Sequence, residues 1–154
     1  MTQATYHRAR RWSQAAGGAA TLTLFAYAVL RWKPSRVEIS GPSMAPTLRP
    51  GDWALAVSGR PVRRGAVVVV QHPVRPGLEI VKRVVAGPGD VAPDGRVLGV
   101  DQWWVEGDAP VDSTDSRHFG PIHRHHIRAA VWLVYWPPNR RRLVHQPLKR
   151  RAAC

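Results

Sequence analysis

Cysteine is almost absent from this chain of 154 residues, because the only one, Cys154, is the last residue. An intrachain disulfide is therefore excluded, and nothing supports a cysteine–histidine nucleophile at the terminus. Acidic residues are also scarce, with 10 Asp and Glu against 23 Lys and Arg, which gives a formal net charge of +13. A charge of this sign favours an acidic partner, such as a nucleic acid or an anionic membrane surface.

The basic residues lack the pattern of a nucleic-acid reader. They form no recognisable reading helix and no sheet motif with interleaved aromatic residues, so we expect no nucleic-acid partner. The densest basic runs are Arg140–Arg142 and Lys149–Arg151. These runs favour contact with anionic lipid headgroups. The alternative is that residues 139–154 are simply a solvated basic tail.

Helical periodicity is scarce after Pro34, and the chain has no internal repeat. Its 14 prolines and 13 glycines separate short apolar runs, which is typical of a β-rich fold with many turns. Val67–Val70 is a run of β-branched residues and predicts a buried strand. Two more strands are expected at Trp103–Glu106 and Ala130–Trp136. We therefore expect one mainly β domain over residues 36–138, preceded by one helix.

Long hydrophobic runs are lacking as well. The candidate for one is Ala15–Leu30, which has no charge and is bracketed by Trp12 and Trp32. A spanning helix needs roughly 17–25 residues, so this stretch is barely long enough. We interpret residues 1–35 as a basic N-terminus with a single-pass membrane anchor at about 13–32. A cleavable signal peptide and a soluble amphipathic helix are the alternatives, and the balanced basic flanks leave the orientation open.

A tight turn surrounds Ser43. Gly41 and Pro42 set the turn directly before this serine, and Pro46 excludes a regular helix or strand ladder just after it. Such a turn can hold a hydroxyl clear of its own backbone, with neighbouring N–H groups free to bind an oxyanion. Serine in such a position is also ordinary turn chemistry, so the segment alone does not define a site.

Lys82 has an unusual place in a predicted strand. In Glu79–Val85, a period of two puts Ile80, Lys82 and Val84 on the same face. Burial between two apolar neighbours disfavours the ammonium form, so the pKa of Lys82 should fall and a neutral amine becomes available as a base. The alternative is an edge-strand lysine whose amine extends into solvent.

Taken in order, four segments resemble the signal peptidase I family of membrane-associated serine proteases, which use a serine–lysine pair. The segments are Ser40–Asp52, Arg64–Val70, Lys82–Asp90 and Gly107–Gly120. The resemblance implies a compact β-barrel or β-sandwich catalytic domain that requires no metal and no other cofactor. It also implies a location at the cell membrane with the catalytic domain outside the cytoplasm, a cytoplasmic location being the alternative.

The resemblance also implies the roles of the main residues. Ser43 would be the nucleophile and neutral Lys82 the general base, cleaving a preprotein or leader peptide after small residues. Ser113 falls at a hydroxyl that orients the lysine, and Asp115 with Arg117 falls at an ion pair that supports the site.

The segment expected at the substrate and the oxyanion contains Gly41, Pro42 and Met44. Gly41 replaces a second serine found in some members, so the oxyanion hole is expected to depend on backbone N–H groups, chiefly that of Ser43. Ala109 replaces an asparagine of the family pattern, which removes a local turn contact.

Other functions stay open at this point. Compact proteases that trim the N-terminal extension of nickel superoxide dismutase are similar through Trp103–Val105, Asp115–Arg117 and Tyr135–Pro138. Self-cleaving repressor-type peptidases also use a Ser–Lys pair, but about 35 residues before Val37 are too few for a helix-turn-helix domain. A non-catalytic basic module that binds membrane surfaces would leave Ser43, Lys82 and Ser113 without a function, and the presence of all three argues against it.

Four histidines crowd the stretch from His118 to His126. His123 and His125 would share one strand face, but no cysteine or suitably spaced carboxylate completes a tetrahedral set. We therefore expect exposed loop histidines and no metal site.

Overall fold

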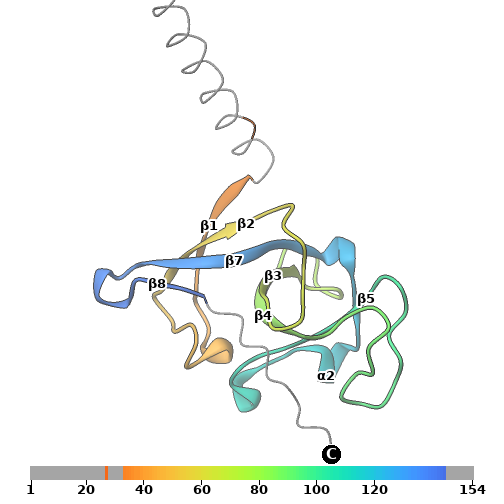
Figure 1. Ribbon diagram of the computed structural model, residues 1–154. Helices are drawn as coiled ribbons and strands as arrows, with labels where there is room; N and C mark the ends of the chain where they lie inside the picture. The colour runs from red at the N-terminus through yellow and green to blue at the C-terminus, as the bar shows by residue number, and fades with distance from the viewer. Residues whose placement is uncertain (1–26, 28–32, 145–154) are drawn as a thin grey trace, which may run out of the picture. The chain divides into compact units, whose positions relative to one another are not determined.

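The computed structural model describes Tyr27 and residues 33–144 of the chain (Figure 1). By its internal contacts, the chain divides into two units, Met1–Lys33 and Pro34–Cys154. The anchor expected at about 13–32 lies outside the described residues, apart from Tyr27. Within the described part of the chain, no helix is long and apolar enough to cross a membrane.

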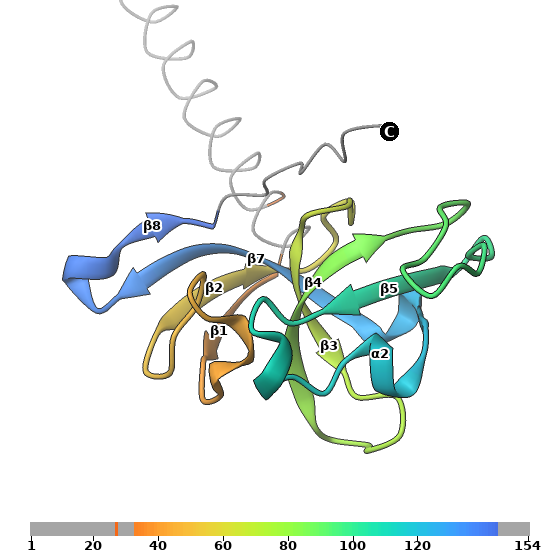
Figure 2. The ribbon, with the colours of Figure 1, turned by 90° about the horizontal axis from the view of Figure 1, so that it is seen from below.

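The second unit is built on one antiparallel sheet that curls into an open half-barrel (Figures 1 and 2). Its strands are β1 (Pro34–Glu38), β2 (Trp53–Val57), β3 (Val67–Gln71), β4 (Glu79–Ala86), β5 (Gln102–Glu106), β6 (Ile122–His123), β7 (Ile127–Trp136) and β8 (Arg142–Leu143). The helical elements are α2 (Ser116–Phe119) and the 3-10 turns η1 (Pro42–Met44), η2 (Pro110–Asp112), η3 (Arg124–His126) and η4 (Pro138–Arg140). The prediction of a mainly β domain is thereby confirmed.

Strand β7 joins the two halves of the sheet. The strand order is β1-β2-β7-β3-β4-β5-β6, and β8 also pairs with β7. Register shifts interrupt the ladders of β7 with both β2 and β3. Irregularities of this kind bend a strand and increase its twist, which accords with the curl seen in Figure 2.

Strand β3 is covered on both faces. Val67 and Val69 belong to a core cluster that also contains Met44, whereas Val68 and Val70 belong to a second cluster with residues of β4, β5, β6 and β7. Burying a valine stabilises the fold by roughly 1.5 kcal/mol or more. Because side chains on both faces must be apolar, the strand is a continuous valine run rather than an alternating one, as the sequence predicts.

The predicted strands are found with small changes of length. The stretch Trp103–Glu106 lies within β5, and Ala130–Trp136 lies within β7, which begins earlier, at Ile127. The stretch from 139 onward, expected as a basic tail, is described as far as residue 144, and two of its residues form β8. Its remainder lies outside the described residues.

Candidate active site

Ser43 and Lys82 meet although they are 39 positions apart in the sequence. Ser43 is the middle residue of η1, where Pro42 at the start of the turn presets the backbone, and its side chain is half-buried. The Nζ atom of Lys82 lies 2.8 Å from the Oγ atom of Ser43, within hydrogen-bond distance. The two residues singled out in the sequence are therefore direct partners.

The strand that carries Lys82 explains why its amine reaches the serine. Lys82 is paired with Val68 of β3, and its side chain is only 3 % exposed. On the same face of β4, Val84 is buried and Ile80 is packed against the same core cluster. The face predicted from the period of two is thus the inner one, and the lysine does not extend into solvent.

The surroundings of Lys82 favour its neutral form. Burial lowers the pKa of Lys82, because an ammonium ion loses its hydration there. The negative charge of Asp115 acts in the opposite direction, and the positive charge of Arg117 lowers the pKa again. The result is a lysine pKa below its ordinary value, as expected for an amine that can accept a proton.

Asp115 is completely buried and lies at the centre of a hydrogen-bond network. Its Oδ2 atom accepts hydrogen bonds from the Gly107 N–H at 2.9 Å and the Ser113 hydroxyl at 2.6 Å. Arg117 donates to both carboxylate oxygens, from Nε at 2.9 Å and from Nη2 at 2.5 Å. Burial alone would raise the pKa of Asp115, but the bonds from Arg117, Ser113 and Gly107 outweigh it and hold that pKa well below its usual range.

Ser113 is bonded to Asp115 rather than to the lysine. Its side chain is buried, and within residues 33–144 no hydrogen bond joins it to Lys82. Ser113 is connected to the lysine only indirectly among the described residues, through Asp115, whose charge acts on the amine. The sequence predicted that Ser113, Asp115 and Arg117 gather near the pair, whereas the bond between Ser113 and Asp115 was not foreseen.

Gly107 fits between the two serine-bearing segments. A Cβ atom at this position would come within 2.6 Å of both the Ser113 Cβ atom and the Ser43 carbonyl oxygen. Two residues later, the Ala109 N–H donates to that same carbonyl at 3.0 Å. The missing side chain thus lets the backbone after β5 approach η1 closely and hold it in place.

Arg83 is a contributor that the sequence analysis missed. Its guanidinium binds both carboxylate oxygens of Asp108, at 2.7 and 2.6 Å. It also donates to the Gly65 carbonyl at 2.9 Å and to the Thr47 hydroxyl at 3.1 Å. One half-buried side chain next to Lys82 therefore ties β4 to three other segments. The available signal was an arginine inside a strand of apolar residues in a chain with few acidic partners.

The residues expected at the substrate and the oxyanion have different environments. Gly41 and Pro42 are exposed, and a Cβ atom added at Gly41 would meet nothing within 4 Å, so the position has room for a side chain. Met44 is only 1 % exposed and packs in the core cluster with β2, β3 and β7. Its side chain fastens η1 to the core, which helps to fix the Ser43 hydroxyl.

Of the histidine-rich stretch, His118 contacts Asp115, whereas His123, His125 and His126 have no hydrogen bond to the Asp115 network among the described residues. His123 stacks on His125, with ring centroids 5.6 Å apart, and its Nδ1 atom lies 3.3 Å from a carboxylate oxygen of Asp101. His123 and His125 are exposed, as expected, whereas His126 is half-buried. In the described part of the chain, no group of three His, Cys, Asp or Glu residues is placed to hold a metal ion.

Known proteins are similar to this chain. Residues 9–102 match the family model described as "Signal peptidase, peptidase S26". The "Mitochondrial inner membrane protease subunit 1" of Mus musculus is 33% identical over 114 residues, which cover 66% of this chain and 69% of that protein. Subunit 2 from the same organism is 35% identical over 118 residues, covering 67% of each chain. The "Mitochondrial ATP-independent inner membrane protease subunit 1a" of Arabidopsis thaliana is 35% identical over 131 residues, which cover 71% of this chain and 74% of that protein.

The chain therefore belongs to the signal peptidase S26 family, a family of serine peptidases. The resemblance found in the sequence is confirmed at this level. These relatives do not favour the dismutase-maturation branch or a non-catalytic membrane-binding module. The matched residues include Ser43 and Lys82 but end before the Ser113–Arg117 segment.

Proposed function

We propose that this chain is a serine endopeptidase in which Ser43 is the nucleophile and the neutral amine of Lys82 is the general base. The observation that carries the proposal is the 2.8 Å contact between the Ser43 hydroxyl and the buried Lys82 amine. A nucleophile and a base in direct hydrogen-bond contact, with the pKa of the base lowered by burial, are what this chemistry requires.

The reaction follows from these two groups. As the Oγ atom of Ser43 attacks the scissile carbonyl carbon, its proton passes to the Nζ atom of Lys82. When the tetrahedral intermediate collapses and the C–N bond breaks, Lys82 returns the proton to the leaving amine. A water molecule then attacks the acyl ester on Ser43, again giving a proton to Lys82. That proton returns to the Ser43 oxygen as the ester bond breaks and the carboxylate product leaves.

The turn η1 also provides an oxyanion donor. The first N–H groups of a helical turn have no partner within the turn, and Ser43 is the second residue of η1. We therefore assign the oxyanion to the backbone N–H of Ser43, which follows the exposed segment at Gly41 and Pro42. The buried Met44 side chain and the Gly107 contact keep that N–H and the hydroxyl in a fixed relation.

We assign the peptidase domain to residues 36–138 and infer that it works at a membrane. Two observations support this inference: the relatives are named as inner membrane proteases, and the net charge of +13 favours anionic lipid surfaces. A single anchor at about 13–32 and a catalytic domain outside the cytoplasm complete the proposal. The substrate class is a preprotein or leader peptide cut after small residues.

The test is cleavage of a membrane-tethered preprotein by the full chain and by the Ser43→Ala and Lys82→Ala variants. Each substitution should lower the cleavage rate by roughly three orders of magnitude or more, because each removes one member of a unit. Ser58→Ala, a serine in the loop after β2, is the matched control and should cleave normally. Thermal unfolding must show that all variants are folded. Undiminished cleavage by folded Ser43→Ala would refute the proposal.

A further inference from the structure

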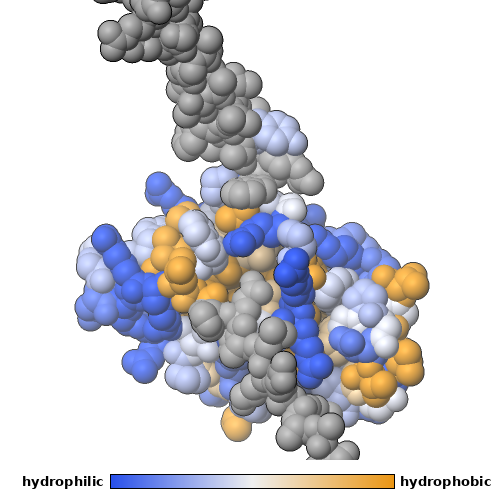
Figure 3. Space-filling view, in the orientation of Figure 1, coloured by the Kyte–Doolittle hydropathy of each residue, from blue (hydrophilic) through white to orange (hydrophobic). Residues whose placement is uncertain are grey.

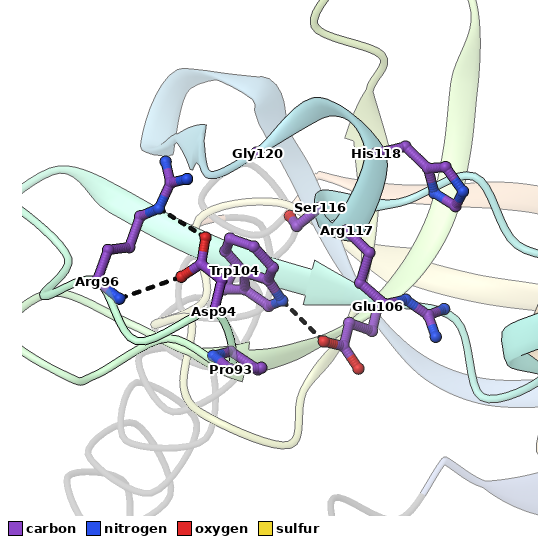
Figure 4. Close-up of a pocket in the computed structure, with 9 residues that line it drawn as sticks. All are labelled: Pro93, Asp94, Arg96, Trp104, Glu106, Ser116, Arg117, His118 and Gly120. Carbon is purple, nitrogen blue, oxygen red and sulfur yellow. Dashed lines mark hydrogen bonds and ion pairs between the residues drawn. The ribbon is translucent and has the colours of Figure 1, made fainter.

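A second candidate site lies in a cavity of about 430 Å³ between α2, β5 and the loop that joins β4 to β5 (Figure 4). Neither Ser43 nor Lys82 lines this cavity, so it has no direct part in the proposed reaction. Its wall combines a tryptophan with three basic side chains and two acidic ones. The question is which kind of ligand such a wall would bind.

One side of the cavity carries Arg96 next to the Trp104 ring. The guanidinium carbon of Arg96 lies 6.0 Å from the ring centroid, within the range of a cation–π contact. The Nε atom of Arg96 is fixed by Asp94 at 2.6 Å. Among the described residues, its Nη1 and Nη2 atoms have no hydrogen-bond partner. The side chain is 56% exposed, so these donors are open to a ligand.

The opposite side carries Arg117 and His118, both from α2. Arg117 uses Nε and Nη2 to bind Asp115, which holds the guanidinium in place and leaves Nη1 as a further donor. The Nδ1 atom of His118 accepts from the Asp115 N–H at 3.4 Å. Because Nδ1 accepts, the neutral imidazole carries its proton on Nε2, which is therefore a donor. His118 is 59% exposed.

Each of the two carboxylates of the wall has an internal hydrogen-bond partner. Asp94 accepts from the backbone N–H of Arg96 at 3.2 Å and from its Nε atom. Glu106 accepts from the Trp104 indole N–H at 2.8 Å (Figure 4). The negative charge of Glu106 also acts on Arg117. The open groups are thus mainly N–H donors, on Arg96, Arg117 and the neutral His118. Such donors, spread over three residues, suit an anion with several oxygens.

We propose that this cavity binds the phosphate group of a phosphate ester. The loop that supplies Arg96 also exposes Val91, Val97 and Val100, which are 65%, 70% and 97% exposed. Figure 3 shows apolar surface over this loop at the right of the molecule. Exposed apolar side chains on the same loop as Arg96 favour an anionic lipid headgroup, whose acyl chains they could contact, over a soluble phosphate ester.

The first experiment measures binding of glycerol 1-phosphate to the full chain carrying Ser43→Ala, so that the result does not depend on catalysis. The probe is the NMR signal of the Trp104 indole N–H, assigned through Trp104→Phe. Arg96→Gln should weaken binding about tenfold, the value of one charge-assisted hydrogen bond. Arg60→Gln removes an equal charge from an exposed loop outside the cavity and should change the affinity less than about twofold.

The affinity of the Glu106→Gln variant for glycerol 1-phosphate tests whether the cavity favours a negatively charged ligand. Glutamine keeps an oxygen for the Trp104 indole but removes the negative charge, so phosphate binding should become several-fold tighter. Weaker binding in Glu106→Gln would overturn the proposal. So would an unmoved Trp104 signal in saturating glycerol 1-phosphate, or equal effects of Arg96→Gln and Arg60→Gln.

A second experiment, with lipid vesicles, tells whether the phosphate belongs to a lipid headgroup or to a soluble ester. The same variants are sedimented with phosphatidylglycerol vesicles and with phosphatidylcholine vesicles, and the bound fractions are compared. The preference for phosphatidylglycerol measures the contribution of the anionic headgroup. If the headgroup is the ligand, Arg96→Gln should lose more of this preference than Arg60→Gln. Equal losses, together with cavity-specific binding of glycerol 1-phosphate, would support the site with a soluble phosphate ester as its ligand.

Discussion

At the scale of single residues, the unusual feature is a lysine amine placed where a charge is poorly solvated. Lys82 is almost fully buried, and the burial lowers its pKa. The unfolded chain would hold this proton up to the ordinary pKa of about 10.4. Between the two pKa values the unfolded state therefore binds more protons than the folded state, and stability rises with pH across that window.

Replacing Lys82 by methionine should stabilise the protein at neutral pH. Methionine has a similar volume and no group that needs hydration, so the free energy of unfolding should rise by about 1–3 kcal/mol. The gain should be largest below the lowered pKa of Lys82 and should vanish as the pH approaches its unfolded value. Urea unfolding of both proteins at several pH values measures this difference. A loss of stability that is independent of pH would contradict the assigned role of burial.

Gly107→Ala should impair both stability and cleavage. The added Cβ atom would collide with the Ser113 Cβ atom and with the Ser43 carbonyl oxygen, each at 2.6 Å, so the backbone must shift. We expect about 1–3 kcal/mol of destabilisation and a lower kcat even where the variant is fully folded. Gly99→Ala is the control, since its Cβ atom would touch only the flexible side chain of Gln102, at 3.4 Å. Equal behaviour of the two variants would show that the close approach at Gly107 is unimportant.

At the scale of elements, the short segments around β4 are held by side-chain packing and single hydrogen bonds rather than by long β-ladders. The turn η1 is fastened by Met44 in the core and by the Ala109 N–H. The segment after η1 is fastened by Arg83 through Thr47. These connections make the position of the Ser43 hydroxyl depend on residues of β4 and of the loop after β5.

Arg83→Lys should lower kcat more than it changes KM. A lysine keeps the charge but cannot reproduce the paired bonds to Asp108 together with those to Gly65 and Thr47. We expect at least a tenfold loss of kcat, from misplacement of Ser43 relative to Lys82. Arg36→Lys in the exposed strand β1 is the matched control. Steady-state kinetics well below the unfolding temperature separate this effect from a loss of folded protein, and an unchanged kcat would exclude the positioning role.

The sequence predicted the elements with strong patterns and missed those without them. The valine run of β3 and the alternation of β4 could be recognised, because burial on two faces or on one face leaves such patterns. The strands β6 and β8 have only two residues each, too few for any period. The bulges of β7 and the bond between Ser113 and Asp115 depend on tertiary packing, which no local pattern records.

At the scale of the whole molecule, the family match and the geometry support the same proposed reaction centre. The family match covers the serine and the lysine, and the fold brings these two side chains into contact. The ion pair of Asp115 and Arg117 connects this centre to the cavity, since Arg117 also lines the cavity wall. A ligand there would lie next to the network that sets the charge around Lys82.

The most direct test of Lys82 as the base is an NMR titration of its side chain in the full chain, together with the pH dependence of kcat/KM. Lys82 should titrate well below the ordinary value of about 10.4. Since the proposed base is the neutral amine, kcat/KM should rise with pH through that same pKa. A Lys82 that titrates at its ordinary value, or a cleavage rate that follows a different group near the histidine pKa of about 6.5, would contradict the account.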